Sequence, residues 1–283
     1  MTGGRAVPKA PVTAMIFTLN EEVNLPACLD SLGWCDEVVV IDSFSNDRTE
    51  RIARDAGTVF AQHEFLGFGS QRNWALANVP LRNEWILILD ADERVPADLA
   101  DEIARAVRSV PENVGAYRVR RRLHMWGRWL RWSSLYPTWV VRLVRRGRAR
   151  YVDRGHAETQ EVEGAVLALR HDLIDENLNG IAAWTERQKR YAIREAEYES
   201  GVPQAPFRAA GLWSADPLVR RARWKHLASC LPLRPWLYFL YVFFWRLGFL
   251  DGGKGFRFCR MKADFYRMVD IEKRRLRGGG RAR

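Results

Sequence analysis

The stretch Trp85-Ile86-Leu87-Ile88-Leu89-Asp90-Ala91-Asp92-Glu93 decides which fold we expect for the chain. Its apolar residues show no polar alternation, which predicts a strand buried on both faces, as in a parallel sheet. Asp90 and Asp92 are two residues apart, so they would point to one face of a continuing strand. Carboxylates at the carboxyl end of such a strand lie where open α/β sheets bind ligands. Their oxygens suit Mg²⁺ or Mn²⁺ bridging to phosphates, and the alternative is a strand followed by an acidic helix start.

Two earlier apolar runs end in polar residues in the same way. Residues 12–19 lead into Asn20-Glu21, and residues 36–41 lead into Asp42-Ser43. Helical patterns separate the predicted strands, at residues 23–32, 49–56, 70–78 and 98–110. This alternation is typical of βαβ units and predicts a parallel sheet. Because right-handed crossovers place the carboxyl ends of the strands on one side, we expect these polar residues to form one ligand site.

After residue 110 the pattern changes. Short strands are predicted at residues 116–122, 138–144 and 165–169, and the longest helical pattern covers residues 179–200. Residues 123–139 are rich in Trp and Arg, side chains that stack on sugar rings and hold acidic groups. These side chains could therefore bind a ligand. The alternative for this segment is a core element or a contact in a homo-oligomer.

Composition predicts a folded protein with an uneven charge. Of the 283 residues, 47% are hydrophobic and 28% are charged, and the formal net charge is +11. Residues 206–283 hold 18 Lys and Arg against five Asp and Glu, so the basic excess belongs to the C-terminal quarter. The four cysteines have no C-x-x-C spacing, which favours a reduced cytosolic setting without a zinc site. Residues 1–11 lack the apolar core of a signal peptide and are expected to form a flexible tail.

The apolar, aromatic segment at residues 231–250 predicts contact with a membrane surface. Between Arg234 and Arg246 lie only 11 uncharged residues, fewer than the ~20 that span a bilayer. Trp and Tyr flanked by Arg and Lys are typical of a helix that lies in the interface of an anionic membrane. The alternative is a helix that packs on protein. The apolar block is too continuous for a nucleic-acid surface, so no nucleic acid is expected as a partner.

Four motifs together resemble those of the family 2 glycosyltransferases. They lie in order at residues 17–21, 42–49, 71–75 and 90–93. The resemblance implies an α/β fold of the GT-A type, which is Rossmann-like, with a mostly parallel central sheet flanked by helices. It also implies a nucleotide-sugar donor. The subgroup that the chain resembles most comprises bacterial glucosyltransferases that extend the lipopolysaccharide core and related envelope glycans.

The resemblance assigns a role to each motif. Asp92 would be the direct ligand of Mg²⁺ or Mn²⁺ on the diphosphate, with Asp90 beside it and His171 nearby. The metal would act as a Lewis acid on the leaving group. The residues implied to line the donor pocket are Phe17, Thr18, Leu19, Asn20, Glu21, Asp42, Ser43, Ser45, Asp47, Arg72, Asp90 and Ala91. The alternatives are helix capping for Asp42 and Asp47, a surface charge for Arg72 and a structural role for His171.

An inverting transfer also needs a general base that takes the proton of the acceptor hydroxyl. The family draws this base from an acidic motif in the second half of the domain. Here the corresponding segment, residues 151–158, departs from the usual wording of the motif. We favour Glu158, with Asp153 as the rival and His156 third, and each could instead be an ordinary loop residue.

We therefore expect an inverting enzyme that transfers a hexose, with UDP-glucose as the favoured donor, to a lipid-linked or lipopolysaccharide-type glycan. The expected parts are a tail (1–11), a nucleotide-sugar half (12–110), an acceptor half (111–205) and a basic helical membrane region (206–283). The expected location is the cytoplasmic face of the bacterial inner membrane, as a peripheral protein. A nucleotidyltransferase and a non-catalytic sugar-nucleotide or membrane scaffold are the alternatives.

Overall fold

The computed structural model describes residues 9–154, 157–201 and 233–279. The chain divides into two compact units, of which the first comprises residues 1–130 and 136–184 and the second residues 131–135 and 185–283. His156, most of the predicted tail and residues 206–232 of the predicted membrane region lie outside the described residues. The four-part division expected from composition stays a prediction.

The first unit is built on a mixed sheet, which has nine strands within the described residues. The strand order is β3-β2-β1-β4-β8-β6-β11-β5, with β7 paired to β6. The strands are β1 (Ala10–Thr18), β2 (Cys35–Asp42), β3 (Val59–Gln62), β4 (Trp85–Asp90), β5 (Glu93–Arg94), β6 (Val114–Met125), β7 (Arg128–Trp129), β8 (Thr138–Arg145) and β11 (Ala165–Glu176). The four strands β3, β2, β1 and β4 run parallel, as do β6 and β11, whereas β8 runs antiparallel to both β4 and β6.

Strand β4 lies inside the sheet and is buried on both faces, as its unbroken apolar run predicts. Leu87 and Leu89 point into one hydrophobic core, and Ile86 and Ile88 point into the other. All four side chains are 2% exposed or less. Each face of a parallel strand needs an apolar side chain when helices cover both sides of the sheet, so a polar residue is tolerated only where the strand ends.

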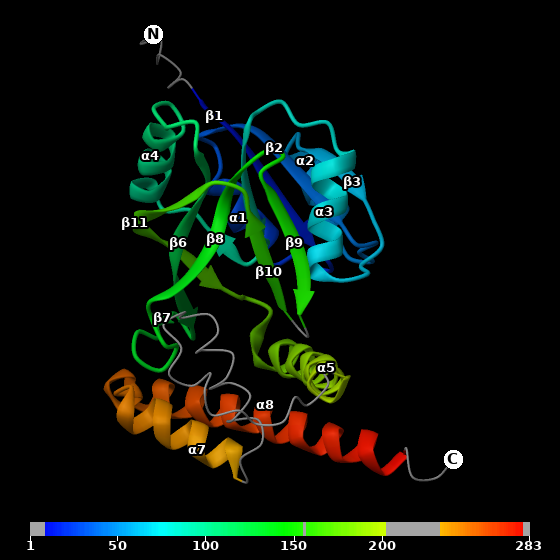
Figure 1. Ribbon diagram of the computed structural model, residues 1–283, viewed down its shortest axis with the longest axis vertical. Coiled ribbons are helices and arrows are strands. Elements are labelled where there is room, and N and C mark those ends of the chain that lie inside the picture. The colour runs from blue at the N-terminus through cyan, green and yellow to red at the C-terminus, as the bar shows by residue number, and fades with distance from the viewer. Residues whose placement is uncertain (1–8, 155–156, 202–232, 280–283) are drawn as a thin grey trace. The chain divides into compact units, whose positions relative to one another are not determined.

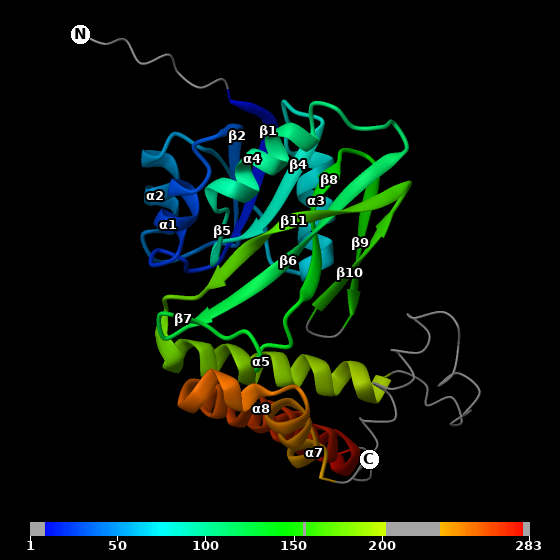
Figure 2. The same ribbon diagram turned by 90° about the vertical axis from the view of Figure 1, so that its left-hand side faces the viewer.

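Helices cover both faces of this sheet (Figures 1 and 2). One core receives residues from α1 (Leu25–Asp30), α2 (Thr49–Asp55) and α4 (Ala97–Ala106). The other core receives residues from α3 (Phe68–Asn78) and from a separate hairpin of β9 (Ala149–Arg154) and β10 (Ala157–Val162). The predicted fold class is thus confirmed as α/β, with a mostly parallel central sheet flanked by helices.

The second unit is helical. Its elements are most of α5 (Gly180–Gly201), α7 (Arg234–Leu240), the π-helix η2 (Tyr241–Trp245), the 3₁₀-helix η3 (Gly248–Asp251) and α8 (Gly252–Gly279). Ala192 and Ala196 of α5 pack against Phe265 and Val269 of α8. None of the helices in the described part of the chain is long and apolar enough to cross a membrane.

Buried charges tie helices α5, α7 and α8 of this unit together. The Glu199 carboxylate of α5 accepts hydrogen bonds from Arg234 of α7, at 3.0 Å, and from Lys273 of α8, at 2.8 Å. The three side chains are only 6–10% exposed. Because desolvated charges are stable only when they are paired, Glu199 of α5 and the cations of α7 and α8 hold these helices together, and Asp270 of α8 adds a contact to Arg234 at 3.7 Å.

Replacing Glu199 by Gln should destabilise the helical unit by about 3 kcal/mol, since it removes the carboxylate that Arg234 and Lys273 share and leaves Arg234 with the longer contact to Asp270, at 3.7 Å. The measurement is amide hydrogen exchange of α5 and α8 together with urea unfolding. The matched control is Glu186→Gln, because Glu186 pairs with Lys189 at 2.6 Å while 62% and 53% of the two side chains are exposed. The control should change stability by less than about 1 kcal/mol. Equal effects of the two substitutions would contradict the role assigned to Glu199.

Candidate functional site

The polar ends of three strands meet at one edge of the sheet in the first unit. Thr18 of β1 pairs with Asp42 of β2, and Phe17 of β1 pairs with Asp90 of β4. The structure therefore brings together the first, second and fourth sequence motifs, as expected for the carboxyl edge of parallel strands.

The Asp42 carboxylate is completely buried beneath the loop that follows β2. It accepts hydrogen bonds from Thr18 Oγ1 at 2.9 Å, from the Ser45 backbone N–H at 2.8 Å and from Gln62 Nε2 at 3.3 Å. Ser45 Oγ donates a further bond, at 2.5 Å. In this arrangement Asp42 holds the loop after β2 through its hydrogen bonds to Ser45. It could contact a nucleobase only if some of these hydrogen bonds were replaced.

The loops after β1 and β2 hold each other through short polar contacts. Asn20 adopts a left-handed conformation with φ of 56°, which Asn tolerates better than most residues. Its N–H donates to Ser45 Oγ at 2.8 Å, and its side-chain oxygen accepts the Asn46 N–H at 2.9 Å. Leu19 is 47% exposed beside this contact, whereas Ser43 is nearly buried and accepts a bond from Gln71 Nε2.

Asp47 shows the capping geometry that the sequence left open. Its carboxylate accepts the Thr49 N–H at the start of α2, at 2.9 Å, and the Glu22 N–H at 3.1 Å. Burial by itself would raise the pKa of Asp47, but these hydrogen bonds outweigh it and lower the pKa below its usual value. Asp47 thus joins the two loops of the site and caps α2 at the same time.

Arg72 of α3 lies inside the site. Its side chain is 3% exposed, and it places Nη2 2.8 Å from Asp90 Oδ1 and Nη1 3.3 Å from Glu158 Oε1. The alternative of a surface charge is therefore wrong. Within the described residues, the buried Arg72 Nε has no hydrogen-bond partner. Three aromatic rings surround the guanidinium at 5.2–5.8 Å, those of Phe17, Phe68 and Tyr151.

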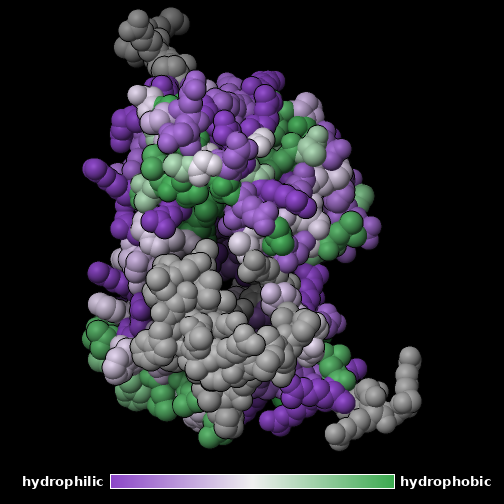
Figure 3. Space-filling model, in the orientation of Figure 1, coloured by the Kyte–Doolittle hydropathy of each residue, from purple (hydrophilic) through white to green (hydrophobic). Residues whose placement is uncertain are grey.

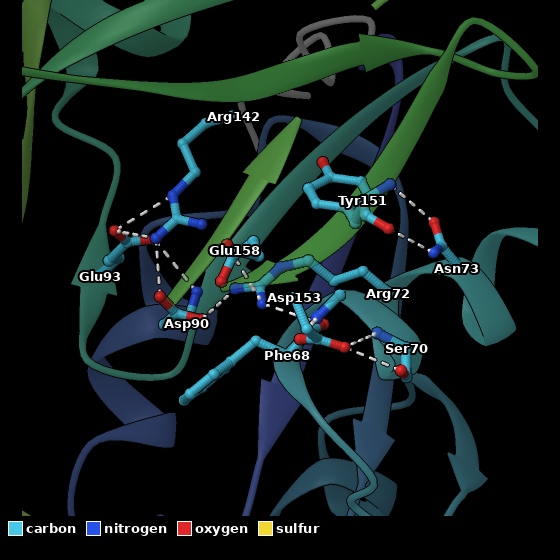
Figure 4. A network of polar contacts seen from close by, with 11 residues as sticks. Phe68, Ser70, Arg72, Asn73, Asp90, Glu93, Arg142, Tyr151, Asp153 and Glu158 are labelled. Carbon is cyan, nitrogen blue, oxygen red and sulfur yellow. Dashed lines mark hydrogen bonds and ion pairs between the residues drawn. The ribbon is translucent and has the colours of Figure 1, made fainter. Parts of the chain in front are cut away.

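Arg142 of β8 is the second cation at the end of β4 (Figure 4). Its Nη2 lies 2.6 Å from Asp90 Oδ2 and 2.7 Å from Glu93 Oε1. Burial alone would raise the pKa of Asp90, but the attraction of Arg142 and Arg72 holds that pKa well below its usual range. Burial also raises the pKa of Glu93, and there it outweighs the attraction of Arg142. Asp90 is thus the ionised carboxylate that both arginines share.

The three candidates for the general base differ in their surroundings. Glu158, at the start of β10, has a side chain that is 13% exposed and in contact with Arg72. Asp153 accepts hydrogen bonds from the Gly69 N–H, the Ser70 N–H and Ser70 Oγ, at 2.7, 3.1 and 2.8 Å. Asp153 therefore caps the N-terminal turn of α3, as Figure 4 shows. His156 lies outside the described residues.

The residues that follow Asp90 lie on different sides. Ala91 is 3% exposed, and its side chain belongs to a hydrophobic core. Asp92 is half-buried, its Oδ2 accepts a hydrogen bond from Asn177 Nδ2 at 2.9 Å, and its carbonyl accepts the Glu176 N–H at 2.9 Å. Asp92 is thereby joined to the end of β11.

The structure does not bring His171 to Asp92. His171 lies five residues before Glu176 on β11, which at the usual rise of a strand is about 16 Å away from the Asp92 contact. Its Nδ1 lies 2.8 Å from the Glu102 carboxylate of α4. Within the described residues, no three His, Cys, Asp or Glu side chains are grouped to hold a metal ion. The expected ligand set of Asp90, Asp92 and His171 stays a prediction, in which His171 lies apart along β11 and pairs with Glu102.

The remaining acids still fit a divalent ion that arrives with a diphosphate. Mg²⁺ is usually held by one or two carboxylates together with substrate phosphates, and not by a complete cage of protein ligands. Asp92 and Asp90 supply such oxygens at the end of β4, although Asp90 is already shared by two arginines. Because Asp90 is engaged by the arginines, Asp92 is the carboxylate that fits best as the protein ligand of the divalent ion.

Asparagines that the motifs did not include tie the loop after β11 to this edge. Asn24 accepts the Leu178 N–H at 2.7 Å and donates to Glu21 Oε2 at 2.6 Å. Asn179 donates to the same Glu21 oxygen at 3.3 Å. Glu21, expected in the donor pocket, therefore binds the loop after β11.

Sequence reasoning also missed Arg142 and Tyr151. One signal for Arg142 was present, because it is the only charged residue in the apolar run at residues 138–144 and a central strand rarely buries a charge without a partner. Nothing comparable marked Tyr151. Its ring lies 5.8 Å from Arg72, and its buried hydroxyl has no hydrogen-bond partner within the described residues.

Together, the parallel strand ends, the joined loops after β1 and β2 and the acids at the end of β4 define an α/β protein with a candidate ligand site at the carboxyl edge of its sheet. The chain belongs to glycosyl transferase family 2, whose family model matches residues 13–170. The recognition that was based on four motifs is therefore confirmed.

Two curated relatives support this assignment. The lipopolysaccharide core biosynthesis glycosyltransferase LpsC of Rhizobium meliloti (strain 1021) is 34% identical over 150 residues, which cover 51% of this chain and 54% of LpsC. An uncharacterized glycosyltransferase of Rickettsia bellii (strain RML369-C) is 37% identical over 93 residues, which cover 32% of this chain and 31% of the relative. The chain thus spans about half, or less, of the length of the relatives that it matches.

Two solved structures are similar at a low level. Glucosyl-3-phosphoglycerate synthase from Mycobacterium tuberculosis, in complex with Mn²⁺, UDP and glucosyl-3-phosphoglycerate, has a TM-score of 0.33 and 22% identity, and the match covers 41% of this chain and 44% of that one. TarS from S. aureus has a TM-score of 0.38 and 15% identity, and the match covers 95% of this chain and 91% of that one.

Replacing Arg142 by Met should destabilise the first unit by about 3 kcal/mol, because Glu93, whose side chain is 1% exposed, loses its cation, and Asp90, whose side chain is 34% exposed, loses one of its two cations. Urea unfolding measures this loss. Arg145→Met, on the same strand, is the control, since its partner Glu84 is 59% exposed and becomes hydrated when it is left alone. The control should cost about 1 kcal/mol. A larger effect at Arg145 than at Arg142 would overturn the assignment of Arg142 to the support of Asp90.

Proposed function

We propose that this chain is an inverting glycosyltransferase that transfers a hexose from a nucleotide-sugar to a lipid-linked or lipopolysaccharide-core-type glycan. UDP-glucose is the donor that the resemblance favours. The observation that carries the proposal is the position of Arg72, whose guanidinium contacts both Asp90, at 2.8 Å, and Glu158, at 3.3 Å. One cation thus links the acid at the end of β4 with the favoured general base.

In the proposed reaction, Glu158 takes the proton of the acceptor hydroxyl as its oxygen attacks the anomeric carbon of the donor. The bond between that carbon and the diphosphate breaks, and the nucleoside diphosphate leaves with the electron pair. Arg72 holds Glu158 toward the site and adds positive charge beside the leaving group. Tyr151 and Phe17, which flank Arg72, keep this contact away from water.

Asp92 would hold Mg²⁺ or Mn²⁺ together with the diphosphate, and the ion would supply Lewis-acid stabilisation of the departing charge. Asp90 faces Arg72 and Arg142, so its proposed task is to orient these cations and the ribose side of the donor. The polar loops around Asn20 and Ser45 would bind the nucleoside. Asp42 would act by holding Ser45 in place, because its own oxygens are buried.

An exposed aromatic residue near two arginines supports the proposal that the chain binds a glycan acceptor. Trp139 of β8 is 39% exposed, and the guanidinium groups of Arg118 and Arg120 lie 4.9 and 5.7 Å from its ring centroid. A sugar ring can stack on such an indole while an acidic or phosphorylated group pairs with Arg118; Arg120 is already bound to Asp172 at 2.6 Å. LpsC is named for lipopolysaccharide core biosynthesis, and a glycan acceptor of this class fits such a surface.

We also propose that the protein works as a peripheral protein on the cytoplasmic face of the bacterial inner membrane. Large apolar side chains of the helical unit are exposed, among them Trp236 at 58% and Trp245 at 80%. Helix α8 carries nine Lys and Arg against three Asp and Glu. Exposed aromatic residues beside a basic helix are typical of proteins that bind anionic membrane surfaces.

Glu158→Gln should lower kcat by about 10²–10⁴-fold, because general base catalysis contributes that much, and it should leave the affinity for the donor nearly unchanged. The measurement is the rate of nucleoside diphosphate release with UDP-glucose and an acceptor extract. Glu161→Gln is the control, because Glu161 lies on the same strand and its side chain is exposed. Full activity of Glu158→Gln would leave Asp153 and His156 as the candidates.

Asp92→Ala should abolish transfer and should also remove the Mn²⁺-dependent rise in melting temperature that a bound nucleotide-sugar produces. A panel of nucleotide-sugars in this assay would identify the donor. Asp98→Ala is the control, since Asp98 lies on the first turn of α4 and is exposed. Normal turnover of Asp92→Ala would contradict the assignment of Asp92 as the metal ligand. Nucleotidyl transfer, or nucleotide binding without turnover, would favour the two alternative classes.

A further inference from the structure

An apolar cavity of about 360 Å³ lies between α7 and α8 in the helical unit. Its walls include Pro235, Trp236 and Phe239 of α7 with Phe256 and Ala263 of α8. This volume lies within the range of about 300–1,000 Å³ that is typical of sites for small molecules. The walls are aromatic and aliphatic, so the cavity suits a hydrocarbon group.

Charged side chains lie along one side of the cavity. Arg260 and Arg267 of α8 are seven residues apart, so they lie on the same side of the helix about 10 Å from each other. Neither has an ion-pair partner in the part of the chain that the structure describes. Asp264 lies between them and opposes part of their charge, which leaves the rim net positive. A ligand with an apolar tail and an anionic head matches this arrangement.

The cavity is continuous with the exposed apolar surface of the unit. Trp236 lines the cavity and is itself 58% exposed, and Leu237, Leu240 and Phe244 follow it with 45%, 48% and 57% exposed. In Figure 3, hydrophobic side chains gather over α7. A soluble anion would gain nothing from this surface, whereas a lipid in a bilayer would be adjacent to it.

We propose that the cavity between α7 and α8 seats one acyl chain of an anionic phospholipid, whose phosphate lies against Arg260 and Arg267. The exposed side chains of α7 and η2 lie in the interface of the surrounding lipid. This inference rests on the proposed function as far as attachment to a membrane is concerned, and it names the ligand class and the residues that bind it. Binding of a single lipid in this cavity would distinguish the unit from a helix that binds an anionic membrane only through non-specific electrostatic attraction.

The probe is a short-chain phosphatidylglycerol at a concentration where it is monomeric, titrated into the full-length protein by calorimetry. A monomer tests the cavity without a bilayer. Arg260→Gln with Arg267→Gln should weaken binding by about tenfold or more, because charge-assisted hydrogen bonds to the phosphate are lost. The matched control, Lys254→Gln with Arg257→Gln, removes the same charge from the same helix outside the cavity and should leave monomer binding within about twofold.

A second substitution tests the apolar part. Ala263→Trp should fill the cavity and abolish binding of the monomer, while vesicles that contain phosphatidylglycerol still bind through the exposed face with reduced affinity. Circular dichroism checks that this variant is folded. Equal affinity for short-chain phosphatidylcholine, or an equal loss in the two charge pairs, would overturn the proposal. A stable dimer by light scattering that excludes the lipid would also overturn it, because a second copy would then be the occupant.

The result can be separated from the fate of the proposed function. Asp92→Ala should still bind the short-chain phosphatidylglycerol, since Asp92 lies in the first unit. Sugar transfer without lipid binding would refute only the lipid site. Lipid binding without sugar transfer would refute only the proposed reaction.

Discussion

The interaction on which the first unit depends most is the contact of Asp90, whose side chain is 34% exposed, with two buried arginines. The carboxylate lies where β4 leaves the core, 2.8 Å from Arg72 and 2.6 Å from Arg142. The arginine side chains are 3% and 6% exposed, and a buried charge is stable only when it is paired, so α3, which carries Arg72, and β8, which carries Arg142, are both held to the end of the central strand. Glu158 and Glu93 are then positioned by the same two cations.

Two neighbouring acids of one motif have different surroundings, and we assign them different roles: Asp90 pairs with arginines, and Asp92 is the proposed ligand of a divalent ion. Asp90 is tied to protein cations, whereas Asp92, two residues later, is half-buried and joined to Asn177 at the end of β11. Charge development at a leaving group is stabilised best by groups that are already oriented before the reaction. Fixed arginines on one side and a single carboxylate for a divalent ion on the other fit the proposed transfer from a nucleotide-sugar.

The helical unit uses the same physical principle for another purpose. Glu199 is buried between Arg234 and Lys273, and it fixes the packing of α5, α7 and α8 while the apolar side chains of α7 and η2 remain exposed. A helix pair that is held by its buried charges can expose aromatic residues without losing its fold. This is the condition that a surface for lipid requires.

The sequence by itself was sufficient for the α/β class, the strands β1, β2 and β4 with their polar ends, and the family, because buried strands leave a local pattern in the residues. It did not predict β5, β7 or the hairpin of β9 and β10. Tertiary structure alone decided which acids are available. It buried Asp42 under Ser45, used Asp153 to cap α3 and placed His171 far along β11 from Asp92. It also recruited Arg142 from the antiparallel strand β8. The physical reason is that hydrogen-bond and ion-pair partners come from residues distant in the chain, and no local spacing records which partner a buried charge finds.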